Sequence, residues 1–179
     1  MFYVSRIFTT PPDSFKSDLQ KSVYRVLGEL GIAYERVDTD EAVTMDDCVL
    51  INERLGMEMV KTLFLCGQAR DVFYLYITSG GSRFNAKKFS RAAGAPHLSF
   101  APAELMFSML GTKIGAATVY SALLDVDNRV KIVFDKAVAE REWYGCSDGT
   151  TTGYMKLRTS DIIGPFLHYA KHEPLIIEA

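Results

Sequence analysis

The sequence predicts an α/β fold: one domain in which helices flank a mixed, mostly antiparallel central sheet. Segments with the apolar spacing of amphipathic helices alternate with short β-branched and aromatic segments typical of strands. The 179-residue chain is nearly half apolar, so it is long enough to bury one core but short for two. Because no repeat, low-complexity tract or linker interrupts it, we expect residues 1–179 to form a single domain.

An amphipathic helix is predicted after the double proline at positions 11–12. Gly31 follows it where a C-terminal cap belongs. The apolar residues that recur there every three or four positions are Phe15, Leu19, Val23, Leu27 and Leu30. Residues 32–38 then alternate like a strand. Thr44, with an aspartate three residues later, is typical of a helix N-cap and predicts a second helix that ends near Gly56.

An antiparallel hairpin is predicted next. The β-rich segments 61–66 and 72–78 are joined by the polar residues 67–71. Both segments are too apolar to face water on two sides, so we expect them to be central strands of the sheet.

The second half of the chain is predicted to continue with short helices and strands. The expected elements are, in order, helices at 85–94 and 101–111 with an edge strand at 97–100 between them, strands at 130–135 and 142–146, a polar loop at 147–153 before residues 154–157, a helical tail at 160–172 and a final strand at 174–178. Pro165 must fall in the first turns of that tail or kink it.

Composition excludes several classes of protein. The net charge of −2 gives no general basic field, so any nucleic-acid contact must come from a local patch. The three cysteines, Cys48, Cys66 and Cys146, are scattered and odd in number, which favours neither a disulfide framework nor a zinc site and fits a reducing cytosol. Without a charged leader or a long apolar run, we expect the protein to be neither exported nor membrane-embedded.

Common catalytic signatures are missing from the sequence. It contains no GxGxxG or GxxxxGK[ST] loop, no HExxH motif and no GxSxG elbow. His168 and His172 are four residues apart, but at a helix end such a pair more often complements the helix charge than binds a metal. We therefore expect no cofactor, no metal and no covalent nucleophile.

Two local features remain as candidates for a binding site. Lys61 stands at the mouth of an apolar strand, where its ammonium could meet a phosphate or simply extend into solvent. Small residues follow the helix at 101–111 and leave backbone N–H groups open to a carbonyl or phosphate, although a tight turn would look the same; they are Gly111, Gly115, Ala116 and Ala117. Neither feature identifies a function by itself.

A cationic cluster is the third feature. Arg83, Lys87, Lys88 and Arg91 are dense enough to follow an RNA backbone, and the last three share one face of the predicted helix. A solvated polar face is an equally good interpretation.

The order of these segments resembles the YbaK-type editing domains associated with prolyl-tRNA synthetase. The resemblance rests on residues 61–65, 74–94, 98–105, 111–125 and 172–178. The FSRAAG, LSFAP and HEP segments are most similar to the free-standing branch, which hydrolyses mischarged Ala-tRNA(Pro). The resemblance implies a single-domain YbaK-like fold over residues 1–179. It also implies a trans-acting aminoacyl-tRNA deacylase in the cytoplasm, with the tRNA acceptor end as substrate and prolyl-tRNA synthetase as a partner.

The resemblance also implies a mechanism. Lys61 matches the lysine that holds the terminal tRNA nucleotide, and a water attacks the ester while backbone N–H groups at Gly115 and Ala116 meet the oxyanion. Substrate-binding positions implied in this way are Thr44, Lys61, Gly111, Thr112, Gly115, Ala117, Thr118 and Ser147. Pocket size then provides selectivity, because it admits alanine and excludes proline.

The chain departs from the family pattern within this loop. Ile114, Val119 and Ser121 stand where relatives carry two prolines and a glycine, and Ser147 replaces a histidine. Loss of the prolines should loosen the loop or redirect its donors, and Ser121 should tolerate a positive φ poorly. Two alternatives therefore stay open: a tRNA-binding or regulatory module that has lost hydrolysis, or a deacylase for another amino acid.

Overall fold

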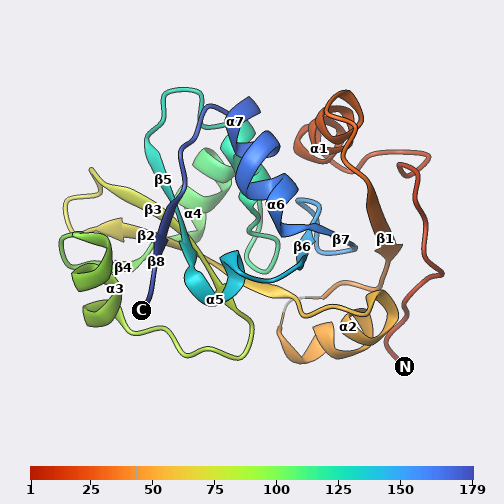
Figure 1. Cartoon of the computed structure of the whole chain (residues 1–179), viewed down its shortest axis with the longest axis horizontal. Helices are drawn as coiled ribbons and strands as arrows, with labels where there is room; N and C mark the ends of the chain where they lie inside the picture. The colour runs from red at the N-terminus through yellow and green to blue at the C-terminus, as the bar shows by residue number, and fades with distance from the viewer. Residues whose placement is uncertain (43) are drawn as a thin grey trace.

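The computed structural model describes residues 1–42 and 44–179, and its strands belong to two sheets (Figure 1). The strands are β1 (Tyr34–Asp38), β2 (Val60–Gly67), β3 (Phe73–Ser79), β4 (Leu98–Phe100), β5 (Val130–Asp135), β6 (Trp143–Ser147), β7 (Gly153–Arg158) and β8 (Leu175–Ile177). The larger sheet has the order β4-β2-β3-β5-β8 and the smaller one β1-β7-β6. Only the β3–β5 and β5–β8 pairs are parallel among these strands.

Short helical segments connect the strands. They are α1 (Asp18–Glu29), η1 (Asp46–Cys48), α2 (Val49–Leu55), α3 (Ala86–Ala93), α4 (Ala103–Leu105), η2 (Met106–Leu110), η3 (Val119–Leu123), α5 (Lys136–Ala139), α6 (Thr159–Asp161), η4 (Ile162–Phe166) and α7 (Leu167–Tyr169). The predicted α/β class and mixed, mostly antiparallel pairing are confirmed. The strands divide between two sheets, however, and the sequence pattern did not predict η3 or α5.

Helix α1 begins at Asp18, three residues later than the apolar spacing predicted. Ser17 Oγ accepts a hydrogen bond from the Gln20 N–H at 3.1 Å, and the Gln20 side chain accepts one from the Lys16 N–H at 2.7 Å. This reciprocal capping fixes the helix start. The Phe15 ring therefore lies before the helix, 6.0 Å from the ring of Tyr24.

The predicted hairpin of β2 and β3 is confirmed, and both strands are internal. On its other edge, β2 pairs with β4 only at residues 65–67. The first half of β2 therefore has an edge that none of the described strands covers. The expected edge strand at 97–100 is confirmed as β4, and its shortness creates this opening.

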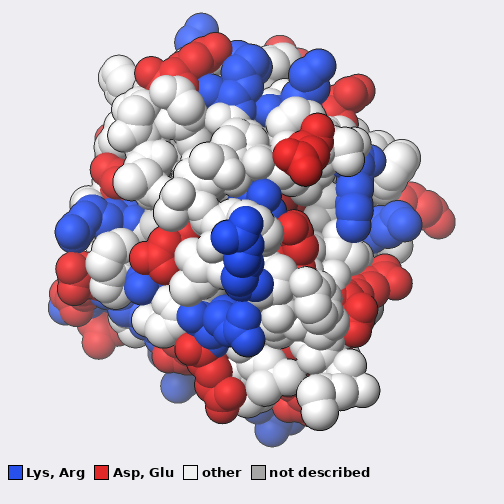
Figure 2. Space-filling model, turned by 90° about the vertical axis from the view of Figure 1, so that its right-hand side faces the viewer, with Lys and Arg blue, Asp and Glu red and all other residues white. Residues whose placement is uncertain are grey.

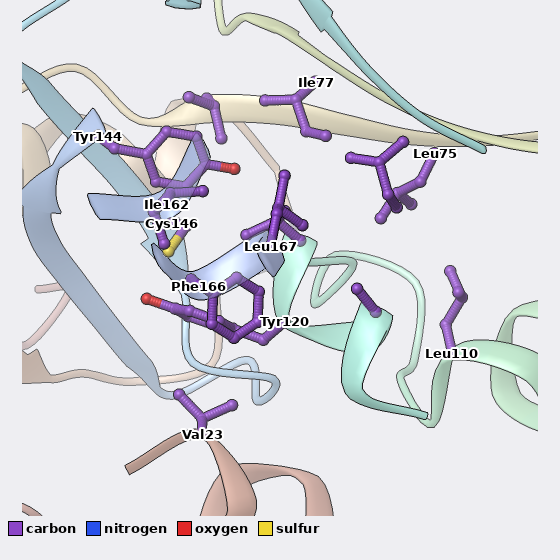
Figure 3. Packing of buried hydrophobic residues seen from close by; sticks show 14 of the residues in the cluster. Val23, Leu75, Ile77, Leu110, Tyr120, Tyr144, Cys146, Ile162, Phe166 and Leu167 are labelled. Carbon is purple, nitrogen blue, oxygen red and sulfur yellow. The ribbon is translucent and has the colours of Figure 1, made fainter. Parts of the chain in front are cut away.

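One core joins both sheets. It packs α1, η3 and the C-terminal helical segment between buried side chains of β2, β3, β5, β6 and β7 (Figure 3). Tyr120 and Phe166 meet there edge to face, with ring centroids 5.2 Å apart. Val119 and Ser121 are also fully buried. Residues 119–121 thus belong to the core of the molecule.

The opposite face of the larger sheet is covered by α3. Phe89 is fully buried there, and its ring centroid lies 4.7 Å from that of Tyr76. Asn85 caps the start of α3 by accepting from the Lys88 N–H at 3.0 Å, and Gly94 ends it with φ +62°. The packing turns the basic face of α3 outward.

The C-terminal segment follows the predicted order. Pro165 lies within the π turn η4, between the short helices α6 and α7, where a wider turn accommodates its missing N–H. The predicted final strand is β8, parallel to β5 at the sheet edge. Among the described residues, no helix combines the length and hydrophobicity needed to cross a bilayer.

Candidate functional site

A cleft of about 380 Å³ lies where the two sheets meet. Its walls come from Ala42, residues 44–48, the first half of β2, the segment 100–117 and residues 146–154. A parallel bridge between Met59 and Gly145 joins the sheets beside it. Five of the residues predicted from the sequence line this cleft: Thr44, Lys61, Gly115, Ala117 and Ser147.

Lys61 is held at the cleft wall by the loop that follows β3. Its Nζ donates a hydrogen bond to the Ser82 carbonyl at 2.7 Å. The loop approaches β2 closely, because a Cβ on Gly80 would lie 2.7 Å from the Met59 carbonyl oxygen. In the part of the chain that the structure describes, Lys61 forms no ion pair. Its ammonium is therefore positioned but not neutralised.

The glycine segment, residues 111–118, presents different residues to its two sides. Gly115 has φ +88°, and the Ala116 N–H donates to the Lys113 carbonyl at 3.1 Å, which closes a tight turn. Gly115 and Ala117 line the cleft, and no described residue accepts a hydrogen bond from either N–H. Ala116 and Gly111 line a separate hollow behind the turn.

The two predicted threonines of this segment have structural positions. Thr118 is fully buried, donates from Oγ1 to the Ser147 carbonyl at 3.0 Å, and accepts from the Tyr120 N–H. It thereby caps η3 and ties the glycine segment to β6. Thr112 is 2% exposed, and its hydroxyl has no partner among the described residues. Gly111, Thr112, Ala116 and Thr118 thus lie outside the cleft lining.

The residues that depart from the family pattern are accommodated without strain. Ser121 does not adopt a positive φ, and its Oγ donates to the Leu110 carbonyl at 2.7 Å. The expectation that serine would be strained here was wrong, because position 121 lies within a buried 3-10 turn. Ile114 behaves differently: it lines the cleft and is 62% exposed.

Ser147 lies in the cleft wall at the end of β6. Its Oγ donates to the Thr150 carbonyl at 2.6 Å and accepts from the Gly149 N–H at 3.0 Å. The neighbouring Asp148 is buried and accepts from the Tyr24 hydroxyl at 2.8 Å. The hydroxyl of Ser147 therefore forms its hydrogen bonds within the loop that follows β6.

Two thiols also line the cleft. Burial raises the pKa of Cys48 to about 11, with a contribution from the nearby Asp47 carboxylate. Burial likewise raises the pKa of Cys146 to about 12. Both thiols are protonated at neutral pH and are poor nucleophiles.

Thr62 is a cleft residue that sequence reasoning missed. The Phe64 carbonyl accepts from the Ala101 N–H at 2.9 Å, so the backbone groups of Phe64 face the open edge of β2. Backbone groups of alternate residues face the same edge of a strand, and those of Thr62 therefore face the cleft. The length difference between the predicted strands at 61–66 and 97–100 was the only sequence signal of this edge.

The predicted cationic cluster lies beside the cleft. Arg83, Lys87 and Lys88 line a second hollow of about 690 Å³, and Arg91 is exposed outside its lining. Where the structure describes the chain, none of the four forms an ion pair. His172 is buried elsewhere, with Nε2 2.8 Å from Asp125 Oδ2. No group of metal-ligating side chains is found in the described ranges 1–42 and 44–179.

Known structures share this fold. A candidate trans-editing enzyme for prolyl tRNA synthetase is 18% identical, with a TM-score of 0.68 over 92% of this chain and 99% of that chain. A protein from a study of epitope backbone grafting onto scaffold proteins is 16% identical, with a TM-score of 0.67 over 91% of this chain and 98% of that one. At these identities the likeness establishes the fold alone.

Sequence comparisons give one result for the family. No curated protein matches the chain. The profile of the aminoacyl-tRNA editing domain matches residues 39–164, which is well over half of the chain and includes every residue that lines the cleft. The YbaK-type resemblance is thus confirmed, and the chain belongs to the aminoacyl-tRNA editing domain family.

Proposed function

We propose that this protein is a trans-acting deacylase that hydrolyses the ester of a mischarged tRNA, with Ala-tRNA(Pro) as the substrate. The observation that carries the proposal is the cleft itself: Lys61, whose ammonium forms no ion pair among the described residues, lines the same largely apolar space as Gly115 and Ala117, whose N–H groups have no described acceptor. Family membership and a fold shared with a candidate trans-editing enzyme support the same reaction class.

In the proposed mechanism, Lys61 binds the phosphate of the terminal nucleotide and thereby sets the ester within the cleft. A water attacks the ester carbonyl, and the N–H groups of Gly115 and Ala117 stabilise the oxyanion. The intermediate then expels the ribose oxygen, which takes up a proton, and free amino acid and tRNA are released. The resemblance implied Ala116 as an oxyanion donor. We assign that role to Ala117 instead, because the Ala116 N–H already closes the turn.

No enzyme nucleophile is required for this reaction. Protonation keeps the thiols of Cys48 and Cys146 unreactive near pH 7, and the Ser147 hydroxyl is occupied within its own loop. The ribose hydroxyl next to the ester orients the water. The contribution of the protein is therefore positioning and electrostatic stabilisation.

The cleft also accounts for a size sieve. Bulky apolar side chains, including Met59, Phe64 and Met106, line it, and in this proposal they restrict the aminoacyl group to a small one. A missing methylene changes binding by only about 1–3 kcal/mol, so a synthetase needs such a second sieve for smaller amino acids. Thr44 stands at the rim, where its Oγ1 donates to Asp47 at 3.0 Å.

The remaining tRNA contacts follow from charge. Arg83, Lys87, Lys88 and Arg91 contact the RNA backbone in this proposal, because they are exposed and unpaired in the described structure. We place the reaction in the cytoplasm, beside prolyl-tRNA synthetase, where mischarged tRNA(Pro) is released.

The decisive experiment incubates the purified protein with tRNA(Pro) charged with alanine, serine, cysteine or proline. Alanine release is expected to exceed the buffer rate, and proline release is not. Lys61→Ala should lower kcat/KM for alanine release by about 10- to 150-fold, which corresponds to a charged hydrogen bond of about 1.5–3 kcal/mol. Lys136→Ala removes an exposed lysine on α5 and should have no effect.

The outcomes separate the candidate functions. If tRNA binds but no ester is hydrolysed, the protein is a binding module and the deacylase proposal fails. If serine or cysteine is released faster than alanine, the reaction stands and the amino-acid assignment fails. Equal rates for Lys61→Ala and wild type would remove Lys61 from the mechanism.

A further inference from the structure

The second hollow adjoins the cleft through two contacts. Lys61 lines the cleft, and the Ser82 carbonyl that holds its Nζ at 2.7 Å belongs to a residue that lines the hollow. Phe100 lines the cleft, and its ring centroid lies 5.4 Å from that of Phe84, which lines the hollow. The Lys61–Ser82 contact and the Phe84–Phe100 contact therefore place the cleft and the hollow next to each other.

The ring of Phe100 is unusually open for a large apolar side chain. It is 60% exposed, although it belongs to β4 and its neighbour Phe84 is half-buried. It contributes little to the core, so its surface is free to contact a ligand. Aromatic faces of this kind stack on nucleic-acid bases, with about 1–3 kcal/mol per base.

The charge around the hollow points to a polyanion. Arg83 and Lys87 line it and have no carboxylate partner in the described ranges, whereas Arg141 and Arg158 pair with glutamates at 3.2 Å. Figure 2 shows the side of the molecule formed by α1, β1 and α2, where acidic and basic side chains are interspersed. Helix α3 lies at the opposite end of Figure 1. The unpaired cations thus form a local patch beside the cleft.

We propose that the Phe84–Phe100 ridge and the adjoining hollow bind the unpaired nucleotides that precede the terminal adenosine. The base next to the terminal one stacks on Phe100, and its phosphate lies near Arg83 and Lys87. This inference rests on the proposed function, since it requires the terminal nucleotide to occupy the cleft. It goes further by assigning a separate subsite for single-stranded RNA and a stacking role for Phe100.

The test measures how affinity grows with RNA length, and it uses ligands that carry no amino acid. The ligands are AMP and the RNA tetranucleotide ACCA, with affinity measured by isothermal titration calorimetry. In wild type, ACCA should bind at least tenfold more tightly than AMP. Phe100→Ala should reduce this gain by about fivefold or more, the equivalent of one lost stacking contact of about 1–3 kcal/mol. Phe100→Leu, which keeps apolar volume without a ring, should behave in the same way, and Phe100→Trp should keep the gain.

Phe107→Ala is the matched control. Phe107 is 67% exposed, as open as Phe100, but it lines the hollow behind the glycine segment. Its removal should leave the gain from AMP to ACCA unchanged. A gain that persists in Phe100→Ala and Phe100→Leu, or that disappears equally in Phe107→Ala, overturns the proposal.

The contribution of Lys87 to binding is tested by the salt dependence of the affinity for ACCA. Lys87→Ala should reduce the slope of log affinity for ACCA against log salt by about 0.7, the value for one phosphate of a single strand. An unchanged slope removes Lys87 from the subsite. If Ala-tRNA(Pro) is hydrolysed in the experiment above but ACCA binds no better than AMP, the subsite fails while the deacylase stands. If Ala-tRNA(Pro) is not hydrolysed and AMP does not bind, the proposed function itself fails.

Discussion

Thr62 acts through its backbone, at the open edge of β2. A mischarged amino acid carries an ammonium group, yet no carboxylate of the described residues lines the cleft. Neutral carbonyl oxygens must therefore accept its protons, and the Thr62 carbonyl faces the cleft from the uncovered strand edge. We expect the Thr62 carbonyl oxygen to accept a hydrogen bond from the ammonium of the aminoacyl group.

Replacing the ammonium of the substrate tests this recognition without changing the protein. Nitrous acid converts alanyl-tRNA to lactyl-tRNA, in which a hydroxyl replaces the amino group at nearly the same volume. A charged donor contributes about 1.5–3 kcal/mol and a neutral one about 0.5–1.5 kcal/mol. We expect KM to rise about tenfold, after the spontaneous hydrolysis in buffer is subtracted from each measured rate. Equal KM values would exclude a specific acceptor for the ammonium.

The resemblance implied that Lys61 and the glycine segment share one site, and in the structure Lys61 lines the cleft together with only Gly115 and Ala117 of that segment. The sequence does not reveal that the Ala116 N–H would turn to Lys113 and leave Ala117 facing the cleft. A one-residue change of direction depends on turn geometry, which composition does not determine. Ser121 shows the same limit, since its burial in η3 follows from tertiary packing.

The loop between β3 and α3 connects the cleft to the rest of the sheet. It carries the Ser82 carbonyl that holds Lys61, and Gly80 lets it pass close to β2. A methyl group at position 80 would lie 2.7 Å from the Met59 carbonyl oxygen, which cannot move without displacing β2. The loop must therefore shift and take the Ser82 carbonyl with it.

Gly80→Ala is expected to lower the free energy of unfolding by about 1–3 kcal/mol, as overpacking does, and to lower kcat/KM because Lys61 loses its anchor. Gly81→Ala is the control, since no atom lies within 4 Å of its added Cβ. It should stay within about 0.5 kcal/mol of wild type and keep full activity. Urea denaturation and alanine release would be measured for both. Identical behaviour of the two variants would contradict the close approach.

Elements were easier to predict than the way they assemble. The hairpin of β2 and β3 follows from local alternation, and the cap of α3 follows from Asn85. Division of the strands into two sheets depends on pairing between β1 and β7, more than 110 residues apart in the chain. Local sequence patterns do not contain such long-range pairings, so the position of the cleft between the sheets could not be predicted from the sequence.

The core that joins the two sheets buries several ionisable groups in their uncharged form. Burial raises the pKa of Tyr120 and of Tyr144, and it raises the pKa of Cys146 to about 12. A group whose pKa is raised on folding contributes its full stability below its unfolded pKa. That contribution is lost as pH rises toward the folded value, because the unfolded chain ionises first.

The protein should therefore unfold in alkali as one unit. At pH 11, Tyr120, Tyr144 and Cys146 each lower the free energy of unfolding relative to neutral pH, by an amount on the order of 1–3 kcal/mol. Several such losses approach the roughly 5–15 kcal/mol that stabilises a typical domain. We expect stability to hold up to about pH 9 and to disappear near pH 11. Circular dichroism and the ionisation of the buried tyrosines should change together; ionisation of Tyr120 or Tyr144 in a still-folded chain would contradict this.

Tyr144→Phe sharpens the alkaline prediction. Its hydroxyl lies among apolar side chains in Figure 3 and has no hydrogen-bond partner among the described residues. Removing it should stabilise the protein at pH 7, because an unsatisfied buried hydroxyl costs about 1–3 kcal/mol, and should raise the pH midpoint of unfolding further. Tyr3→Phe, at a position that is 56% exposed, is the control and should leave the midpoint unchanged. A lower midpoint for Tyr144→Phe would mean that its hydroxyl is solvated, and the core would then be open where the two sheets meet.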